Sequence, residues 1–137
     1  MLTLGVPTLN RYDLLAELIA SCECGTRKPD KYFIVDNGTA LNASSLPESA
    51  RARVHIHNPG KNIGVAASWN FILKACGDIT LLACDDTCMH ANLIEQMEKH
   101  AMDPHALFLH PELKKQHNKF ACFIPKTELM ARIGYFD

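Results

Sequence analysis

The chain has 137 residues, a length typical of a single domain, and its 47% hydrophobic and 21% charged residues are ordinary for a globular protein. A net charge of -1 without a basic cluster argues against a nucleic-acid-binding protein, and no apolar run reaches the length of a transmembrane helix. The first residues meet Pro7 too soon for a signal peptide, so we expect a cytoplasmic protein.

The six cysteines stand at positions 22, 24, 76, 84, 88 and 122. Their spacing lacks the paired CxxC pattern of a structural zinc site, and no secretory signal supports disulfides. We therefore expect free, mostly buried thiols.

Short apolar runs alternate with amphipathic segments along the whole chain. From Tyr12, apolar residues recur with helical spacing until Gly25, while residues 39–53 indicate a loop with at most one helical turn. Near the end, Thr127 is expected to cap a helix that Gly134 terminates. The expected elements are strands at 2–6, 32–35, Val54–His57, Ile79–Ala83, 106–109 and 120–124, with helices at 12–24, 65–75, 91–102 and Thr127–Ile133.

This alternation predicts an α/β fold in which helices cover both faces of a mainly parallel sheet. We expect one three-layer α/β/α domain over residues 1–137.

The apolar run Ile79–Ala83 stops abruptly at two adjacent carboxylates, Asp85 and Asp86. In open α/β sheets, ligands bind at the C-terminal ends of the strands. Paired carboxylates there suit a hard divalent cation whose remaining ligands come from phosphate oxygens. A solvated turn or a helix entry is the alternative interpretation of these two residues.

Residues 7–11, 36–37 and 85–86 all follow expected strands, and residues 62–70 open a helix. In a parallel sheet these four segments face one crevice. A carboxylate there accepts hydrogen bonds from a base or a ribose, and Arg11 or Lys61 meets phosphate. The set suits a nucleotide that carries a leaving group, although residues 36–38 taken alone are typical of a plain turn.

Taken in order, residues 6–11, 35–38, 62–70, 83–87 and 133–137 resemble the nucleotide-binding part of a family 2 glycosyltransferase with the GT-A fold. The resemblance covers nearly the whole chain. It implies sugar transfer from a nucleotide-sugar, commonly UDP-linked, to a glycan, lipid or protein acceptor, assisted by Mn²⁺ or Mg²⁺ and inverting at the sugar. It also implies that the late strand at 120–124 runs antiparallel, and it leaves a homo-oligomer open.

The resemblance also assigns roles. Pro7 to Leu9 line the base pocket, Asp36 accepts from the base, Asp85 contacts ribose or metal-bound water, and Asp86 binds the metal, with Asp85 as its neighbouring ligand. The implied nucleotide-sugar-binding residues are Pro7, Thr8, Leu9, Asn10, Arg11, Asp36, Asn37, Asn62, Gly64, Asn70 and Asp85.

The chain departs from the family at three points. Cys84 stands where many members have a first aspartate, and Leu9 stands where an aromatic residue often stacks on the base. The family's catalytic base and much of its acceptor site lie beyond position 137, so we expect a domain truncated before that region. Asp137, with Glu112 as its rival, is the candidate base.

Other functions remain as alternatives. A non-catalytic or partner-dependent nucleotide-sugar-binding module fits the same donor residues. A sugar-1-phosphate nucleotidyltransferase is disfavoured because no glycine-rich loop follows the first strand, and a dinucleotide oxidoreductase is disfavoured because no GxGxxG does. His55 and His57 share one strand face and are read as a surface pair rather than a zinc site, whereas His110 is held as an additional metal or acceptor contact.

Overall fold

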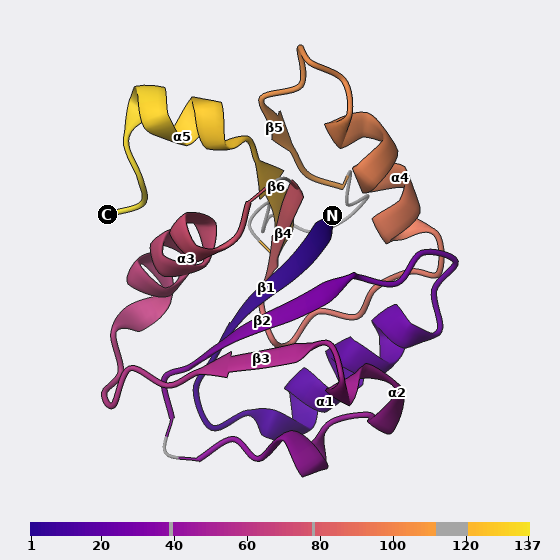
Figure 1. The fold of residues 1–137 in the computed structure, drawn as a ribbon, viewed down its shortest axis with the longest axis vertical. Coiled ribbons are helices and arrows are strands. Elements are labelled where there is room, and N and C mark those ends of the chain that lie inside the picture. The colour runs from indigo at the N-terminus through magenta and orange to yellow at the C-terminus, as the bar shows by residue number, and fades with distance from the viewer. Residues whose placement is uncertain (39, 78, 112–120) are drawn as a thin grey trace.

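The computed structural model describes residues 1–38, 40–77, 79–111 and 121–137. Within them, six strands form one sheet in the order β3-β2-β1-β4-β6-β5 (Figure 1). The strands are β1 (Leu2–Thr8), β2 (Lys31–Asp36), β3 (Val54–His57), β4 (Ile79–Ala83), β5 (Phe108–Leu109) and β6 (Cys122–Pro125). The helices are α1 (Tyr12–Glu23), η1 (Ala43–Ser45), α2 (Glu48–Arg51), α3 (Gly64–Ala75), α4 (Leu93–Ala101) and α5 (Thr127–Ile133).

The four strands from β3 to β4 are parallel, which confirms the expected mainly parallel sheet. β6 runs antiparallel to β4 and also to β5. The late antiparallel strand is therefore confirmed, with its described part beginning at Cys122.

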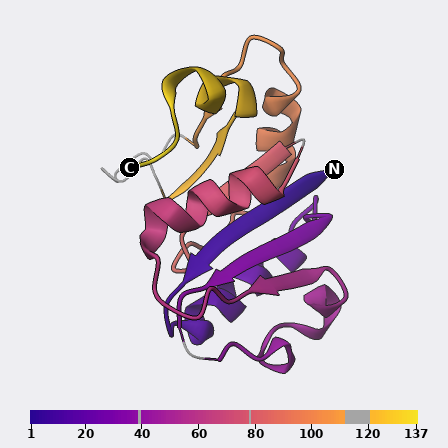
Figure 2. The same ribbon diagram turned by 60° about the vertical axis from the view of Figure 1, so that its left-hand side comes forward.

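Two hydrophobic clusters lie on opposite faces of the sheet. One is built with α1, α2 and α4, and the other with α3 and α5. Figure 2 shows α3 in front of the strands with α1 behind them. All seven residues of β1 are buried, as expected for a central strand covered on both faces.

Local sequence explains the closest packing. α1 buries Leu15, Leu18, Ile19 and Cys22, which recur along one helical stripe. In β1, a side chain at Gly5 would lie 2.4 Å from Ile72 of α3, so only glycine lets this helix approach the central strand so closely.

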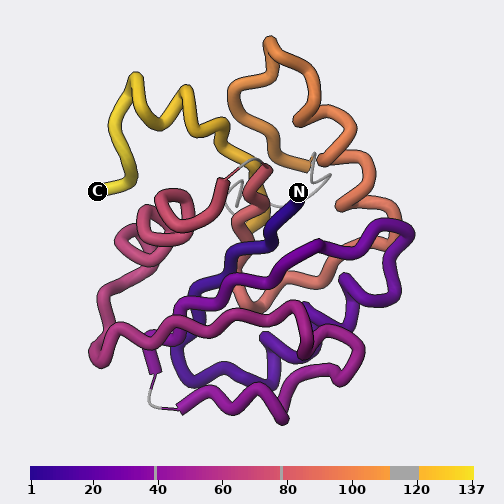
Figure 3. The backbone as a smooth tube through the Cα atoms, in the orientation of Figure 1, coloured from indigo at the N-terminus to yellow at the C-terminus, as the bar shows by residue number. Residues whose placement is uncertain are grey.

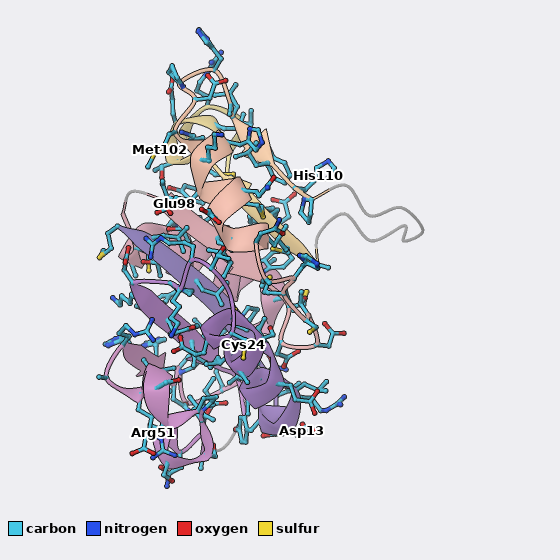
Figure 4. The ribbon with its side chains drawn as sticks, turned by 90° about the vertical axis from the view of Figure 1, so that its right-hand side faces the viewer. Asp13, Cys24, Arg51, Glu98, Met102 and His110 are labelled. Carbon is cyan, nitrogen blue, oxygen red and sulfur yellow. The ribbon has the colours of Figure 1, made fainter. Side chains whose placement is uncertain are left out.

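A network of ion pairs joins the loop after α1 to α4. Arg27, after α1, binds Asp30 at 2.8 Å and Glu98 of α4 at 2.7 Å. In Figure 4, Glu98 lies on α4, on the same part of the molecule as Met102 and away from Asp13 and Arg51. Because Arg27 donates two hydrogen bonds to Asp30, and Leu2 donates a third, the pKa of Asp30 falls to about 2.

Several expected boundaries need correction. Thr127 is the first residue of α5 rather than its cap; Lys126 occupies the cap position and makes no side-chain capping bond. In the expected loop at 39–53, the described residues 40–53 hold two short helical pieces, η1 and α2, because Leu46 and Ala50 pack into the core. The expected strand at 106–109 shortens to Phe108–Leu109, which pairs with β6.

All six cysteines are free thiols, as expected. Burial raises the pKa of Cys22 and that of Cys122 to about 12, so these thiols stay protonated within the core. Cys24 and Cys88 are exposed, so the expectation of burial holds for only part of the set. Among the described residues, no helix is both long enough and apolar enough to cross a membrane.

Candidate functional site

A cleft of about 240 Å³ opens where β1, β2 and β4 end and α3 begins. All four segments that were expected to converge contribute to its walls. Residues from 7–11, 36–37 and 85–86 lie at the ends of β1, β2 and β4, and residues from 62–70 form the start of α3. The lining residues are Pro7, Thr8, Leu9, Arg11, Asn37, Asn62, Gly64, Val65 and Asp85.

The β1 and β4 side of the cleft is fixed by strand register. The parallel pairing that sets Gly5 beside Leu82 brings Thr8 level with Asp85 three residues later. Thr8, which is buried, donates a hydrogen bond from Oγ1 to Asp85 Oδ2 at 2.8 Å. This bond orients the carboxylate of Asp85 and leaves its other oxygen available to a ligand.

Asp86 is exposed and follows Asp85 in a tight turn at the end of β4. The amide of Thr87 closes this turn on the carbonyl of Cys84 at 3.2 Å, and the Thr87 hydroxyl donates to the carbonyl of Ala121 at 3.0 Å. The turn is thereby anchored to the residue just before β6, the antiparallel neighbour of β4, so the two carboxylates project from a fixed stretch of backbone.

The donor chemistry of this pair fits a hard divalent cation. Mg²⁺ is usually held by one or two carboxylates together with phosphate oxygens rather than by a complete protein cage. Consistent with this, no group of three or more metal-ligating side chains gathers among the described residues. Asp85 and Asp86 would thus hold a cation only with oxygens from a ligand. Burial, and then the charges of Asp86 and Asp85, raise the pKa of Cys84, which keeps its thiol protonated beside them.

Asp36 lies under the cleft rather than on its surface, and only 1% of it is exposed. Its Oδ1 accepts from the Tyr12 hydroxyl and the Gly38 amide, each at 2.9 Å. Its Oδ2 accepts from the Leu41 amide at 2.9 Å and from Asn58 Nδ2 at 3.2 Å. The carboxylate organises the loop after β2, and its acceptor positions are occupied by the protein itself.

Asn37 follows Asp36 and lines the cleft, and its side-chain amide makes two hydrogen bonds to the protein. Its Nδ2 donates to Ser68 Oγ at 2.9 Å, and its Oδ1 accepts from the Ile63 amide at 3.0 Å. Ser68 in turn donates to the carbonyl of Gly64 at 2.6 Å. This chain of bonds fastens the end of β2 to the first turn of α3.

Asn70 does not line the cleft. Its Nδ2 donates to the Phe136 carbonyl at 2.6 Å, and its Oδ1 accepts from the Phe136 amide at 2.9 Å. The Phe136 ring packs edge-on against Trp69 and Phe123. Figure 3 shows the last residues running back toward α3. Asn70 therefore holds the C-terminal segment, and Asp137 lies exposed at its end, outside the residues that line the cleft.

The remaining predicted residues lie on the cleft wall or in the turns beside it. Leu9 and Arg11 line the cleft, and Arg11 keeps a 3.5 Å ion pair with Asp13. Asn10 has a positive φ of 57° and is exposed beside the cleft, where it shapes the turn between β1 and α1. Asn62 Oδ1 accepts from the Gly64 amide at 2.9 Å, which sets the entry into α3.

Sequence reasoning missed Val65 and Ser68 as individual site residues. Val65 lies on the cleft wall and Ser68 is buried behind it. Helical spacing from Gly64 would have pointed to Ser68, because positions four apart in a helix share one face.

The histidines considered as further sites, His55, His57 and His110, do not line the cleft. His57 stacks on Phe71 with ring centroids 4.1 Å apart, and His55 packs against Phe33, so both imidazoles belong to a surface aromatic cluster. His110 lines a second cavity, of about 460 Å³, with residues of α4. Glu112 lies outside the described residues.

Solved structures share this fold. The mannosyltransferase PcManGT from Pyrobaculum calidifontis, in complex with GDP-Man and Mn²⁺, matches 99% of this chain with a TM-score of 0.79 at 18% identity. TarS 1-349 from S. aureus matches 99% with a TM-score of 0.76 at 16% identity, and its complex with UDP-GlcNAc matches with 0.75 at 15% identity. The chain spans about half of each of these proteins, 47%, 50% and 48% respectively.

No curated protein sequence gives a significant match. At the level of families, residues 3–122 match the model of glycosyl transferase family 2, which is most of the chain. The fold, with its antiparallel strand beside a parallel sheet, agrees with that of the GT-A glycosyltransferases named above. On this match, the chain belongs to glycosyl transferase family 2.

Proposed function

We propose that this domain binds the nucleotide-sugar donor of a glycosyltransferase and that the cleft at the ends of β1, β2 and β4 is its donor site. The observation that carries the proposal is the place of Asp85, held by Thr8, in the lining of that cleft, with the exposed Asp86 next to it in the chain but outside the lining residues. Family membership supports it, since members transfer sugars from activated donors.

The polar groups at the cleft have distinct tasks in this proposal. The guanidinium of Arg11, more than half exposed, is positioned to meet a phosphate. Asp85 contacts the ribose or a cation-bound water, and Asp86 is the principal ligand of Mn²⁺ or Mg²⁺. When bound, such a cation would stabilise the negative charge on the departing diphosphate. One solved structure of similar fold is a complex with GDP-Man and Mn²⁺, which supports the use of a divalent ion.

The chemistry we propose is inverting transfer. An acceptor hydroxyl attacks the anomeric carbon from the side opposite the nucleotide and gives its proton to a carboxylate, while the bond from that carbon to the diphosphate oxygen breaks and the nucleoside diphosphate leaves. Among the described residues that line the cleft, Asp85 is the one acid, and its place beside Thr8 suits donor binding. Asp137 stays the candidate base, at the end of a segment that Asn70 holds against α3.

A donor-binding module that needs a partner for turnover is the second candidate. It is favoured by one observation: the cleft supplies donor-side groups, while no second carboxylate lines it among the described residues. The acceptor, the sugar and the oligomeric state belong to the same open proposal.

Turnover separates the two candidates. The protein is incubated with Mn²⁺ and with UDP-, GDP- or dTDP-sugars, and free nucleoside diphosphate is measured over time. A transferase that also hydrolyses its donor slowly releases nucleotide in a Mn²⁺-dependent manner. Donor binding without release, in the presence of candidate acceptors, favours the binding module. Failure of every donor to bind with Mn²⁺ would refute both.

A further inference from the structure

We propose that a buried group of sulfur atoms, packed between α1, α4 and β6, binds a soft monovalent metal ion such as Cu⁺. The ligands are the thiolate of Cys122 and the thioethers of Met89 and Met97. None of these three residues lines the donor cleft, so this site is separate from the proposed donor site and does not depend on it.

The three sulfur atoms come from distant parts of the chain. Met89 lies in the loop between β4 and α4, Met97 lies on α4, and Cys122 is the first residue of β6. Each is at most 5% exposed, and all three belong to the hydrophobic cluster on the α1 and α4 face of the sheet. The amide of Met89 donates to Ser21 Oγ at 2.9 Å, and Cys122 pairs with Ala83 of β4. Ordered backbone therefore sets the places of the sulfur atoms.

The spacing of the sulfur atoms suits a single ion. Cys122 Sγ lies 4.0 Å from Met89 Sδ and 3.9 Å from Met97 Sδ. A sulfur ligand stands about 2.3 Å from a bound zinc ion, and three sulfurs at that distance around one ion, all in a plane, are about 4.0 Å apart. Two of the three spacings thus match a trigonal site already. Any remaining adjustment falls on the flexible methionine side chains.

The ligand types decide which ions bind. Thiolates and thioethers prefer soft ions such as Cu⁺, whereas Mn²⁺ and Mg²⁺ prefer oxygen. Among the described residues no three His, Cys, Asp or Glu side chains gather, so a metal at this place depends on the two thioethers. We therefore expect the sulfur site and the carboxylates of the donor cleft to take different ions.

Charge favours a monovalent ion over a divalent one. On binding, the S–H bond of Cys122 breaks, a sulfur–metal bond forms, and the proton passes to solvent. Burial raises the pKa of this thiol to about 12, so the proton leaves when a cation takes its place. One thiolate with one Cu⁺ carries no net charge, and a neutral group costs far less to bury than a charged one.

The position of the site gives an ion both a way in and an effect. Met89 directly follows Cys88, which is exposed, so the buried sulfurs lie close to solvent along this loop. The same loop begins at the turn of Asp85 and Asp86. A bound ion would join this loop to α4 and to β6, and it should stabilise the folded domain because the unfolded chain does not hold the three sulfurs together.

The test is a competition for Cu⁺ between the protein and bicinchoninate, in the absence of oxygen. Exposed thiols also bind soft ions, so the measurements use a Cys24→Ser/Cys88→Ser background. We expect this protein to take up one Cu⁺. Adding Met89→Leu and Met97→Leu conserves core volume and should weaken binding by at least about 100-fold. Met102→Leu is the matched control, since Met102 is 70% exposed, and it should leave binding unchanged.

Two further measurements guard against misfolding. Circular dichroism checks the fold of each variant, and the single substitutions Met89→Leu and Met97→Leu should each weaken binding by at least about 10-fold. One equivalent of Cu⁺ should raise the melting temperature of the background protein and leave that of the doubly leucine-substituted variant unchanged. If the background protein takes up no Cu⁺, or if the leucine variants bind it equally well, the sulfur atoms only pack the core and the inference is wrong.

Discussion

The two walls of the cleft use their polar groups in opposite ways. Beneath and along the β2 and α3 wall, Asp36 and Asn37 are buried; Asp36 accepts four hydrogen bonds from the protein, and Asn37 makes two with it. On the β1 and β4 wall, Asp85 has one protein partner, Thr8, and Asp86 is exposed. Acidic residues that look equivalent in the sequence are thus structural on one wall and open to ligands on the other.

The comparison teaches that the position of a carboxylate at a strand end does not define its task. Its task depends on how many hydrogen bonds it accepts from the protein, because each acceptor position that a protein donor occupies is one fewer for a ligand. If this is right, removing Asp36 should mainly reduce stability, and removing Asp85 or Asp86 should mainly reduce binding.

The largest expected effect is on metal-dependent binding by Asp86→Ala. Loss of an outer-shell partner of a metal commonly costs 10- to 100-fold in affinity, and loss of a direct ligand should cost about 100-fold or more. The measurement is the dissociation constant for UDP with Mn²⁺. Glu17→Gln, which neutralises an exposed acid on α1, is the control and should leave binding unchanged.

The next effect is on stability, from Asp36→Ala. Four donors would lose their acceptor, and the buried ones among them would be unsatisfied, so we expect a loss of about 2–4 kcal/mol in the free energy of unfolding. Urea denaturation measures it. Asp86→Ala, at the exposed acid after β4, is the matched variant and should change stability by less than about 1 kcal/mol. Equal losses in the two variants would contradict the contrast between the walls.

A smaller effect is expected from Thr8→Val, which keeps the shape of the side chain but removes the donor to Asp85. An unrestrained Asp85 should weaken Mn²⁺-dependent nucleotide binding by about 10-fold, as for other partners that orient a metal ligand. Thr127→Val, at an exposed position of α5, is the control. If Thr8→Val binds as tightly as the unaltered protein, Thr8 does not position Asp85.

Outside the cleft, Asn70→Ala should free the C-terminal segment. The substitution removes two hydrogen bonds to the Phe136 backbone, while the Phe136 ring keeps its contacts with Trp69 and Phe123. We expect a loss of about 1–2 kcal/mol in stability and faster proteolysis near Tyr135. Nucleotide affinity should not change, in contrast to the role that the family resemblance assigns to Asn70.

The smallest expected effect concerns acid stability. The pKa of Asp30 is lowered to about 2 in the folded protein, so its contribution is present above its unfolded value near 4 and is lost as the pH falls from about 4 to about 2. Asp30→Asn should flatten the fall of melting temperature across this window. The effect is small because Asp30 is 40% exposed and solvent screens its ion pair with Arg27. An unchanged profile would mean that other carboxylates dominate.

Much of the fold could be predicted because its signals are local. The apolar runs and the helical spacing from Tyr12 gave the order of elements, and that order implied a mainly parallel sheet. Boundaries failed where tertiary packing decided them. Leu46 and Ala50 sit in a stretch of small polar residues, and their burial shapes two helical pieces that propensity alone did not indicate.

For the site, the sequence predicted which segments converge but not which side chains face the ligand. Asp36, Asn37 and Asn70 all occur in motif-like segments, yet their tasks depend on partners far along the chain, such as Tyr12, Ser68 and Phe136. No local pattern encodes such partners. Asp85 was easier to place because strand register alone brings it beside β1.

The most direct test of the central claim is calorimetric titration of the unaltered protein with UDP and with GDP, each with Mn²⁺ and with a chelator instead. The account predicts binding of both nucleotides with Mn²⁺ and a loss of at least about 100-fold when the cation is removed. Equal binding with and without Mn²⁺ would contradict the assignment of Asp85 and Asp86 as the groups that hold the diphosphate through a cation.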